Sequence, residues 1–362
     1  MKTTDLAMIF VAILIPIVVV VYVDVSFLLK TEEQRLYYTN IINSAINDAT
    51  YAMKTVEGEE QDVDYGYSGI SEKKVTVNAR VAVKTFYESL YDNFDIKGDS
   101  TGEAYIKSHI PALAVVDYNG VYIYSIDNYV DDKTRESYTD YILKPKRYFT
   151  YTYAIRGNNL IEGEDLAENG GIDNLNTITV QFTMDDYIYV IKDDGTIEGF
   201  YLEDTKNNAI LYNSNYALRE QVIQHLRIKR SQVISDVVSQ EMSFAVSNHN
   251  LYSDMDYEFV FPTIALSDWE EMVDNVGIIA FIQGINIGNE KLDYVAHGIS
   301  GLKITKRYYV SRATNGISSL DYYHSEKECT VYKSSYKSYN GYYMNKIDAS
   351  TNGYYPCPVC KP

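Results

Sequence analysis

Cysteine is absent before position 329 of this 362-residue chain, and its three copies are Cys329, Cys357 and Cys360. Disulfides therefore cannot hold most of the chain together, so it must rely on a buried apolar core. Motifs of the common hydrolases, metalloproteases and nucleotide-binding enzymes are also missing. We expect a protein that is not an enzyme, in which the scattered histidines have structural roles: His109, His225, His249 and His297.

Basic residues are scarce as well, because 32 Lys and Arg stand against 50 Asp and Glu, for a formal net charge of −18. Binding of a nucleic acid requires a basic surface that neutralises phosphate, so we expect no nucleic-acid partner. Tyrosine, in contrast, is abundant at 37 residues, and hydrophobic residues make up 46% of the chain. This composition predicts packed structure with half-buried strands rather than disorder.

One long apolar run is present, from Leu6 to Leu29, and only Pro16 and Asp24 interrupt it. As a helix rising ~1.5 Å per residue it reaches ~36 Å, enough to cross a hydrocarbon core of ~30 Å. The run is longer than the ~7–15 apolar residues of a signal peptide, and no small-residue cleavage pattern follows it. We predict a permanent single-span membrane anchor over residues 1–30.

The positions after the anchor predict a continuation of the same helix. Apolar residues recur there with the i, i+3, i+4, i+7 spacing of an amphipathic helix, at Ile42, Ala45, Ile46, Ala49, Met53 and Val56. Gly58 follows, together with a stretch rich in acidic residues. We therefore expect a stalk helix and an acidic link over residues 31–72, followed by a main domain over residues 73–320.

Helical patterns in the main domain are separated by strand-like segments. Apolar residues at helical spacing predict helices over residues 75–94 and 216–249. A capping box at Ser267-Asp268-Trp269-Glu270 predicts the start of a third helix, which we expect to end in the apolar run GIIAFIQG. This alternation of helices and strands is typical of the α+β class.

Two hairpins indicate that the sheet of this domain is antiparallel. Asn119-Gly120 lies between apolar arms and predicts a type I′ turn, which needs two residues of positive φ. Asp194-Gly195 predicts a second hairpin, with residues 177–184 as a third strand of the same meander. A further strand is expected over residues 301–312. We therefore predict an α+β domain built on antiparallel sheet with packed helices.

The tail, residues 321–362, contains the strongest candidate site, formed by His324, Cys329, Cys357 and Cys360. A neutral imidazole and three thiolates, two of them in a C-x-x-C pair, make the closed tetrahedral shell that structural Zn²⁺ prefers. Two alternatives remain: a disulfide from Cys329 to the C-x-x-C pair, which leaves one thiol over, and a redox C-x-x-C. We predict a Cys₃His zinc-binding tail.

The pattern Tyr-His-x4-Cys followed by Gly-Tyr-x-Pro-Cys-x-x-Cys runs from Tyr323 to Cys360. It resembles the small metal-binding module related to the zinc domain of the Ada repair protein, whose nearest relatives carry Cys in place of His324. The resemblance implies zinc binding. It does not imply methyl transfer, because the basic DNA-binding surface that accompanies that chemistry is absent.

The front of the chain combines an apolar run that has Pro16 near its middle and Asp24 at its far end with an amphipathic helix that contains Ala-Ile-Asn-Asp-Ala. This pattern resembles the TadE-like and pilin-like subunits of tight-adherence pilus systems. The processing motif of true pilins is missing, which favours a minor or assembly subunit. The resemblance implies partners among other pilus or secretion-system subunits, contacted through the helix, and a possible oligomer.

Asp24 is the residue through which we expect the helix to contact a partner. A carboxylate in the hydrocarbon region is costly in lipid alone, so it marks a partner contact by default, although at headgroup level it would simply be hydrated. The charges that flank the run do not decide its orientation, whereas the acidic, Tyr-rich composition favours an extracytoplasmic location of the main domain.

We therefore expect a membrane-anchored, extracytoplasmic structural or assembly subunit of a pilus-like surface or secretion apparatus. The alternatives are a solitary surface receptor or adhesin that binds a peptide or glycan through a Tyr-rich face, and a surface hydrolase of unfamiliar type.

Overall fold

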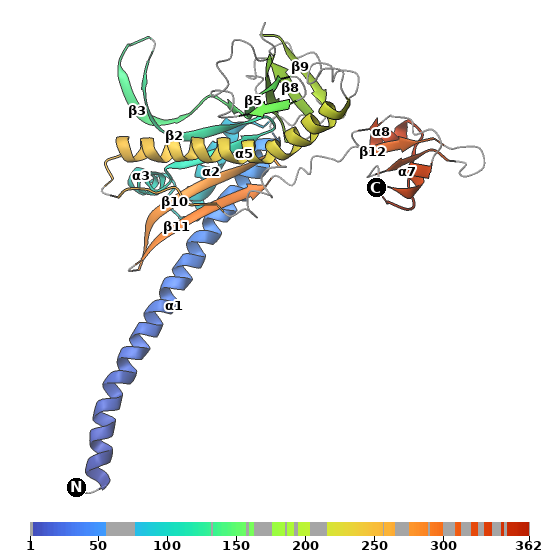
Figure 1. Cartoon of the computed structure of the whole chain (residues 1–362). Helices are drawn as coiled ribbons and strands as arrows, with labels where there is room; N and C mark the ends of the chain where they lie inside the picture. Colours follow the sequence, from blue (N-terminus) through green and yellow to red (C-terminus); the bar gives the residue numbers. More distant parts are fainter. Residues whose placement is uncertain are drawn as a thin grey trace.

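A long N-terminal helix, a helix-covered sheet domain and a small C-terminal module make up the structure (Figure 1). This computed structural model describes residues 3–55, 77–131, 133–156, 159–162, 176–184, 187–191, 195–202, 216–255, 257–264, 275–288, 290–299, 308–312, 320–324, 329–334, 342–343 and 346–361. The expected acidic link, Gly58 and the capping box at residues 267–270 lie outside these ranges. The described part confirms the α+β class, because helices accompany mainly antiparallel sheets.

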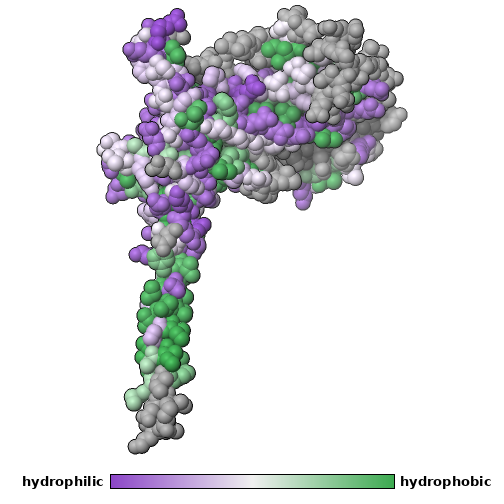
Figure 2. Space-filling view, turned by 60° about the vertical axis from the view of Figure 1, so that its left-hand side comes forward, coloured by the Kyte–Doolittle hydropathy of each residue, from purple (hydrophilic) through white to green (hydrophobic). Residues whose placement is uncertain are grey.

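The first helix, α1 (Thr3–Thr55), is a single element of 53 residues. Its first half projects from the rest of the molecule and shows a mainly apolar surface (Figure 2). Val20 there is 58% exposed, whereas Ile46 and Ala49 in the second half are fully buried. The helix is long and apolar enough to cross a membrane, and most of its exposed apolar side chains lie where the sequence predicts the span.

The second half of α1 belongs to the core of the domain, which the expected stalk over residues 31–72 does not anticipate. The predicted apolar face is confirmed, since Ile42, Ala45, Ile46, Ala49 and Met53 are all buried. They share one hydrophobic cluster with the second helix and the sheet. The domain therefore begins inside α1, because burying this face against a sheet stabilises it more than leaving it solvated in a free stalk.

A six-stranded antiparallel sheet forms the centre of the domain, in the order β11-β10-β1-β2-β3 with β4 paired to β2. Its strands are β1 (Ala112–Asp117), β2 (Gly120–Val130), β3 (Ser137–Leu143), β4 (Arg147–Tyr148), β10 (Gly277–Ile287) and β11 (Glu290–Ile299). All six residues of β1 are buried, because helices cover both faces of the sheet at this point.

The strand register shows which helix covers which face. Val115 is paired with both Ile278 and Tyr122, and Ile278 with Gly298, so these four residues share one face. A Cβ added to Gly298 would lie 2.3 Å from a side-chain carbon of Ile46, which places α1 against that face. Gly298 is needed there because the helix approaches the strand so closely.

Three further helices of the domain lie in the described residues: α2 (Ala79–Asn93), α3 (Ser100–Ser108) and α5 (Tyr216–Tyr252). The Asn78 side chain caps α2 by accepting from the Val81 N–H at 3.1 Å, and Asp99 caps α3 in the same manner. The helices predicted over residues 75–94 and 216–249 are thus confirmed. Helix α5 lies across β1 and β2, opposite to α1 and α2 (Figure 1).

The hairpin predicted at Asn119-Gly120 is confirmed, but its predicted turn type is wrong. Strand β1 ends at Asp117 and pairs with Gly120 of β2, so the two loop residues are Tyr118 and Asn119, neither of which has positive φ. Gly120 has a different reason to be glycine. A Cβ at this position would lie 2.6 Å from the backbone oxygen of Arg147, so the close approach of β4 excludes a side chain.

The apolar run GIIAFIQG is a strand and not the end of a helix, so this prediction is corrected. The run begins at Gly277 and forms β10, which pairs with β1 on one side and β11 on the other. Most of its residues are buried, because this strand is covered on both faces. A continuous apolar segment fits both a buried helix and a central strand, and long-range pairing decides between them.

A second, five-stranded antiparallel sheet has the order β6-β5-β7-β8-β9. Its strands are β5 (Thr150–Arg156), β6 (Asn159–Glu162), β7 (Asn176–Phe182), β8 (Tyr187–Ile191) and β9 (Ile197–Tyr201). The predicted meander of β7, β8 and β9 is confirmed. Asp194 lies outside the described residues, whereas Gly195 has a φ of +80°, which glycine adopts without strain.

The described part of the C-terminal module includes a strand that starts at Tyr308, before the expected boundary at residue 321. Its four-stranded sheet has the order β14-β12-β13-β15, and β13 and β15 run parallel. The elements are β12 (Tyr308–Ser311), β13 (Tyr322–His324), α7 (Thr330–Ser334), β14 (Tyr342–Tyr343), α8 (Lys346–Thr351) and β15 (Tyr355–Pro356). Of the strand expected over residues 301–312, the described part is β12, which pairs with β13 and belongs to the tail.

Protonation of His249 is expected to destabilise the domain. This α5 side chain is fully buried against the ring of Phe259, and burial is the main cause that lowers its pKa to about 4. The pKa in the unfolded chain is about 6.5, so the unfolded state binds the proton more tightly. Stability is complete above pH ~6.5 and falls as the pH decreases toward 4, by roughly 3 kcal/mol in total.

Urea unfolding of the full chain and of His249→Gln at several pH values measures this effect. The variant should lose less free energy of unfolding between pH 6.5 and 4 than the wild type. The groups that face His249 include His109, whose pKa burial also lowers, and the hydroxyl of Tyr141, whose pKa burial raises. His109→Gln serves as the comparison. Equal pH profiles for wild type and His249→Gln would contradict the assignment.

Candidate metal centre

Three separate segments bring the four ligand candidates of the tail together. His324 is the last residue of β13, Cys329 directly precedes α7, and Cys357 and Cys360 follow β15. The parallel pair β13 and β15 positions the C-x-x-C segment, because the Cys357 N–H donates to the Tyr323 carbonyl at 3.1 Å. The Lys361 N–H then donates to the Cys357 carbonyl at 3.0 Å, which closes the turn around the two cysteines.

One ligand atom from each of the four residues lies within 4.8 Å of the others. The Sγ atoms of Cys329 and Cys357 are 3.8 Å apart, and the Sγ of Cys360 is 3.7 Å from Nδ1 of His324. A tetrahedral ion with metal–sulfur bonds of ~2.3 Å and a metal–nitrogen bond of ~2.0 Å separates two sulfurs by about 3.8 Å and sulfur from nitrogen by about 3.5 Å. The four side chains therefore fit a tetrahedral metal ion.

The same distances separate this arrangement from the disulfide alternative. A disulfide joins its sulfurs at about 2.05 Å, whereas all three cysteines are free in the structure. Cys329 and Cys357 are buried and Cys360 is half-buried. Three thiols and an imidazole converge on a single point, which is the requirement for a shared metal ion.

Ser311 holds the His324 ring in the orientation that a metal ligand requires. The Ser311 Oγ lies 2.7 Å from Nε2 of His324, so Nε2–H can donate to it while Nδ1 faces the three sulfurs. His324 is fully buried, and this burial lowers its pKa to about 4. The neutral imidazole, which is the metal-binding form, is therefore favoured at neutral pH.

The thiols have divergent acidities. Burial raises the pKa of Cys329, but the N–H groups of Tyr332 and Val331 and the neighbouring thiols outweigh it, so that its pKa is lowered overall. Burial is the main cause that raises the pKa of Cys357 to about 11, and the neighbouring thiols of Cys329 and Cys360 raise it further. A divalent cation would remove that repulsion, since coordinated thiols are deprotonated.

The predicted metal residues are confirmed as a cluster, while Asp24 lies elsewhere. His324, Cys329, Cys357 and Cys360 converge as the sequence predicts, and they can hold a structural metal. Asp24 is on the exposed first half of α1, so the structure leaves its expected partner contact untested. The arrangement offers four protein ligands to a tetrahedral ion, which is compatible with a structural metal.

The sequence does not reveal the residues that support the ligands. Ser311 reaches His324 only because β12 and β13 pair with Ser311 opposite Tyr322. The ring of Tyr332 lies 5.4 Å from that of His324 in an edge-on arrangement. The sequence offers one indication, which is the strand-like segment Tyr308–Ser311. The structure shows that its polar residue, Ser311, is buried.

Comparison of the chain with protein-family models, with curated proteins and with solved structures finds no match.

Proposed function

We propose that the protein is a membrane-anchored, extracytoplasmic structural or assembly subunit of a pilus-like surface or secretion apparatus. The observation that carries this proposal is the continuity of α1, whose apolar first half is exposed and whose second half lies in the domain core. The anchor and the domain are thus one rigid element. Neighbouring subunits that pack their helices together would therefore fix the positions of their domains as well.

The contacts at the point where α1 leaves the domain support the division of the helix into an exposed first half and a buried second half. The Cβ that Gly288 lacks would lie 2.9 Å from the Thr31 hydroxyl, and Arg35 forms an ion pair with Glu290 at 2.5 Å. Both contacts join α1 to the turn between β10 and β11. The residues before them are apolar and exposed, and about 20 such residues are needed to span a bilayer.

An assembly role fits this geometry better than a tethered receptor. A receptor on a flexible link can reorient toward its ligand, whereas a helix continuous from span to core couples the two rigidly. Asp24 lies within the proposed span, where a carboxylate is stabilised by a partner helix or by water at the interface. The charge of −18 and the scarcity of basic clusters support an extracytoplasmic location of the domain.

We further propose that the metal of the tail is Zn²⁺. Soft thiolate ligands with one imidazole in tetrahedral geometry select zinc over magnesium or calcium, which prefer oxygen ligands. The separations of 3.8 Å and 3.7 Å between ligand atoms agree with zinc bond lengths. The ion would join β13, α7 and the end of β15, so that it stabilises a module with a small hydrophobic core.

Replacement of Asp24 by Ala is expected to reduce partner recovery. Tagged full-length protein purified from membranes in mild detergent should recover its partner subunits, or untagged copies of itself, about ten times less efficiently when Asp24 is changed. A polar contact between membrane helices contributes about 1–2 kcal/mol, which corresponds to a change of about five- to thirtyfold in recovery. Quantitative mass spectrometry of the purified complexes provides the measurement.

Glu33→Ala is the matched control, because it removes the same charge from the same helix beyond the apolar run. Recovery with this variant should equal that of the wild type, and both variants should stay in carbonate-washed membranes. Unchanged recovery with Asp24→Ala would contradict the partner contact. Release of the protein by carbonate, or protection of its domain from protease added to intact cells, would contradict the anchored extracytoplasmic assignment.

A further inference from the structure

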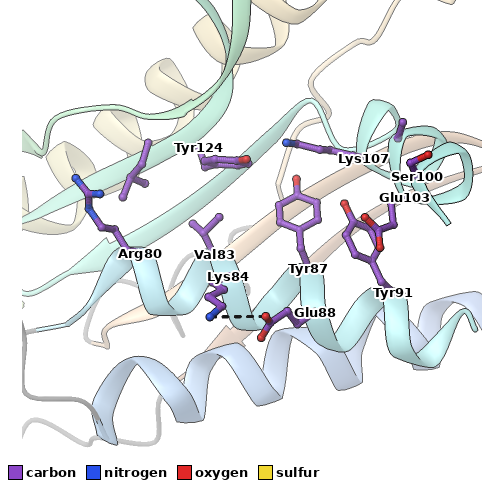
Figure 3. Close-up of a pocket in the computed structure, with 12 residues that line it drawn as sticks. Arg80, Val83, Lys84, Tyr87, Glu88, Tyr91, Ser100, Glu103, Lys107 and Tyr124 are labelled. Atoms are coloured by element: carbon purple, nitrogen blue, oxygen red, sulfur yellow. Dashed lines mark ion pairs between the residues drawn. The ribbon is translucent and has the colours of Figure 1, made fainter. Parts of the chain in front are cut away.

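A cavity of about 650 Å³ opens on the domain between α2, α3 and the strands β2 and β3. Three tyrosines, Tyr87, Tyr91 and Tyr124, line it together with Lys107 and Glu103 (Figure 3). Its volume lies within the ~300–1,000 Å³ of small-molecule sites, which combine aromatic walls with a few polar groups. The cavity is far from the metal centre in the fold, and neither the metal nor the anchor accounts for it.

Lys107 is a cation that the described residues do not neutralise by an ion pair. Its Nζ lies over three tyrosine rings, 4.4 Å from the centroid of Tyr141, 5.4 Å from Tyr124 and 5.8 Å from Tyr87. Figure 3 shows the side chain extending from α3 across the cavity toward Tyr124. The rings hold the ammonium in place through cation–π attraction, but they leave its N–H donors available to an anion.

The hydroxyl of Tyr87 is a second unused group. Tyr87 is only 7% exposed, and within the described part of the chain its hydroxyl has no hydrogen-bond partner. In Figure 3 the ring rises from α2 and its oxygen points toward Lys107. A buried hydroxyl without a partner is unfavourable, so its position beside a cavity indicates that a ligand supplies the missing hydrogen bond.

The carboxylates of the cavity restrict the chemistry of that ligand. Glu103 and Glu88 both line it together with the cations Arg80, Lys84 and Lys107, and Glu88 is balanced by Lys84 at 3.8 Å. Three cations against two carboxylates give the lining a small positive excess, which matches a ligand with one negative group better than a multiply charged anion such as a phosphate ester. Hydroxyl donors of the ligand could bind the carboxylates. The ligand must therefore combine one negative group for Lys107, several hydroxyls for Glu103 and the tyrosines, and an apolar face for the rings.

We propose that this cavity binds an acidic saccharide of the uronic-acid class. The sugar carboxylate would accept from Lys107 Nζ and the Tyr87 hydroxyl, a sugar hydroxyl would donate to Glu103, and the C–H face of the ring would stack on Tyr91 or Tyr124. Each group of the cavity then has a counterpart in one molecule. Because the cavity opens to solvent, a sugar unit within a longer acidic chain fits the site as well.

Calorimetric titration of the full-length protein in detergent tests the proposal. The probes are a disaccharide of glucuronic acid and xylose, its methyl ester, acetate and triglycine. The acid disaccharide should bind at least about ten times more tightly than the ester, since a hydrogen bond to a charged group accounts for about ten- to a hundredfold in affinity. Acetate and triglycine should bind more weakly still.

Two variants separate binding from folding. Lys107→Met should weaken binding of the acid disaccharide by about ten- to a hundredfold and should remove the preference over the ester. Lys133→Met, which removes an exposed lysine from the tip of the β2–β3 hairpin, is its control and should bind as the wild type does.

Tyr87→Phe should weaken binding by about three- to tenfold while it raises the Tm of the free protein, because it removes a buried hydroxyl without a partner. A hydroxyl with a purely structural role would change the Tm in the opposite direction and leave the affinity unchanged, and this result would overturn the proposal. No binding of the acid disaccharide, equal binding of its ester, or equal binding of acetate or triglycine would also overturn it.

Discussion

Cys357→Ser is expected to abolish metal binding by the tail and to unfold the C-terminal module. Elemental analysis of the full-length protein should fall from about one zinc per chain to nearly none. Limited proteolysis should then cleave the C-terminal module of the variant faster than that of the wild type. The physical reason is that a structural zinc ion contributes on the order of 10 kcal/mol of folding free energy. The loss of one thiolate ligand removes most of this contribution.

The loss should be confined to the module, because its hydrophobic clusters are separate from that of the main domain. Tyr308, Val310, Tyr323, Ala349 and Tyr354 form one small cluster, and a second lies around the cysteines. A module with so little apolar core needs a further constraint, which the proposed metal would supply. The unfolding midpoint of the main domain should therefore remain unchanged.

Val359→Ala is the matched control for this experiment. Val359 lies between the two cysteines of the C-x-x-C segment, its side chain is 56% exposed, and it contributes its backbone N–H to the Cys357 sulfur at 3.4 Å. Replacement by Ala preserves that N–H, so zinc content and protease resistance should be unaffected. Wild-type protein without metal and with a mapped disulfide from Cys329 would contradict the metal centre.

Lys146→Met is expected to destabilise the main domain by about 3–5 kcal/mol. Lys146 forms an ion pair with Asp117 at 2.7 Å, and both side chains are at most 5% exposed. Asp117 also accepts from the Tyr118 N–H at 2.7 Å, so its carboxylate is fixed at the β1–β2 turn. Removal of the ammonium leaves this carboxylate in a buried site without its countercharge, and desolvation is then no longer offset.

A double-mutant cycle distinguishes this cause from a simple loss of packing. Lys146→Met/Asp117→Asn removes both charges, so it should be more stable than Lys146→Met alone, as measured by urea unfolding of the full chain. Lys144→Met is the control, because Lys144 pairs with Asp127 at 2.8 Å but the two side chains are 15% and 27% exposed. Its cost should be about 1 kcal/mol or less. A double variant less stable than Lys146→Met would contradict the explanation.

Local pattern was sufficient to predict several features. The helical spacing of Ile42, Ala45, Ile46, Ala49 and Met53 identified a buried face correctly, because that face is a property of one continuous helix. The metal residues were predictable for a related reason. Few side-chain types bind a soft cation, and the chain carries its only three cysteines beside a histidine in one segment.

Features that depend on two distant segments were missed. The run GIIAFIQG was assigned to a helix because its pairing with β1, more than 150 positions earlier in the numbering, leaves no local trace. The type I′ turn was wrong for a similar reason, since Gly120 is required by the approach of Arg147 and not by its own φ. The cavity around Lys107 and Tyr87 combines α2, α3, β2 and β3, and no spacing in the sequence indicates it.

The sequence by itself determined the apolar helix, the α+β class and the set of metal-binding residues, because each depends on composition or on the periodicity of one segment. Only the tertiary structure decided where the domain begins within α1 and that residues 277–287 are a central strand. It also decided that Lys146 is buried in an ion pair and that Lys107 lies over tyrosine rings, unlike an ordinary surface lysine. The physical reason is that burial and pairing are set by the segments that meet in space, and they change the energy of a residue more than its immediate neighbours do.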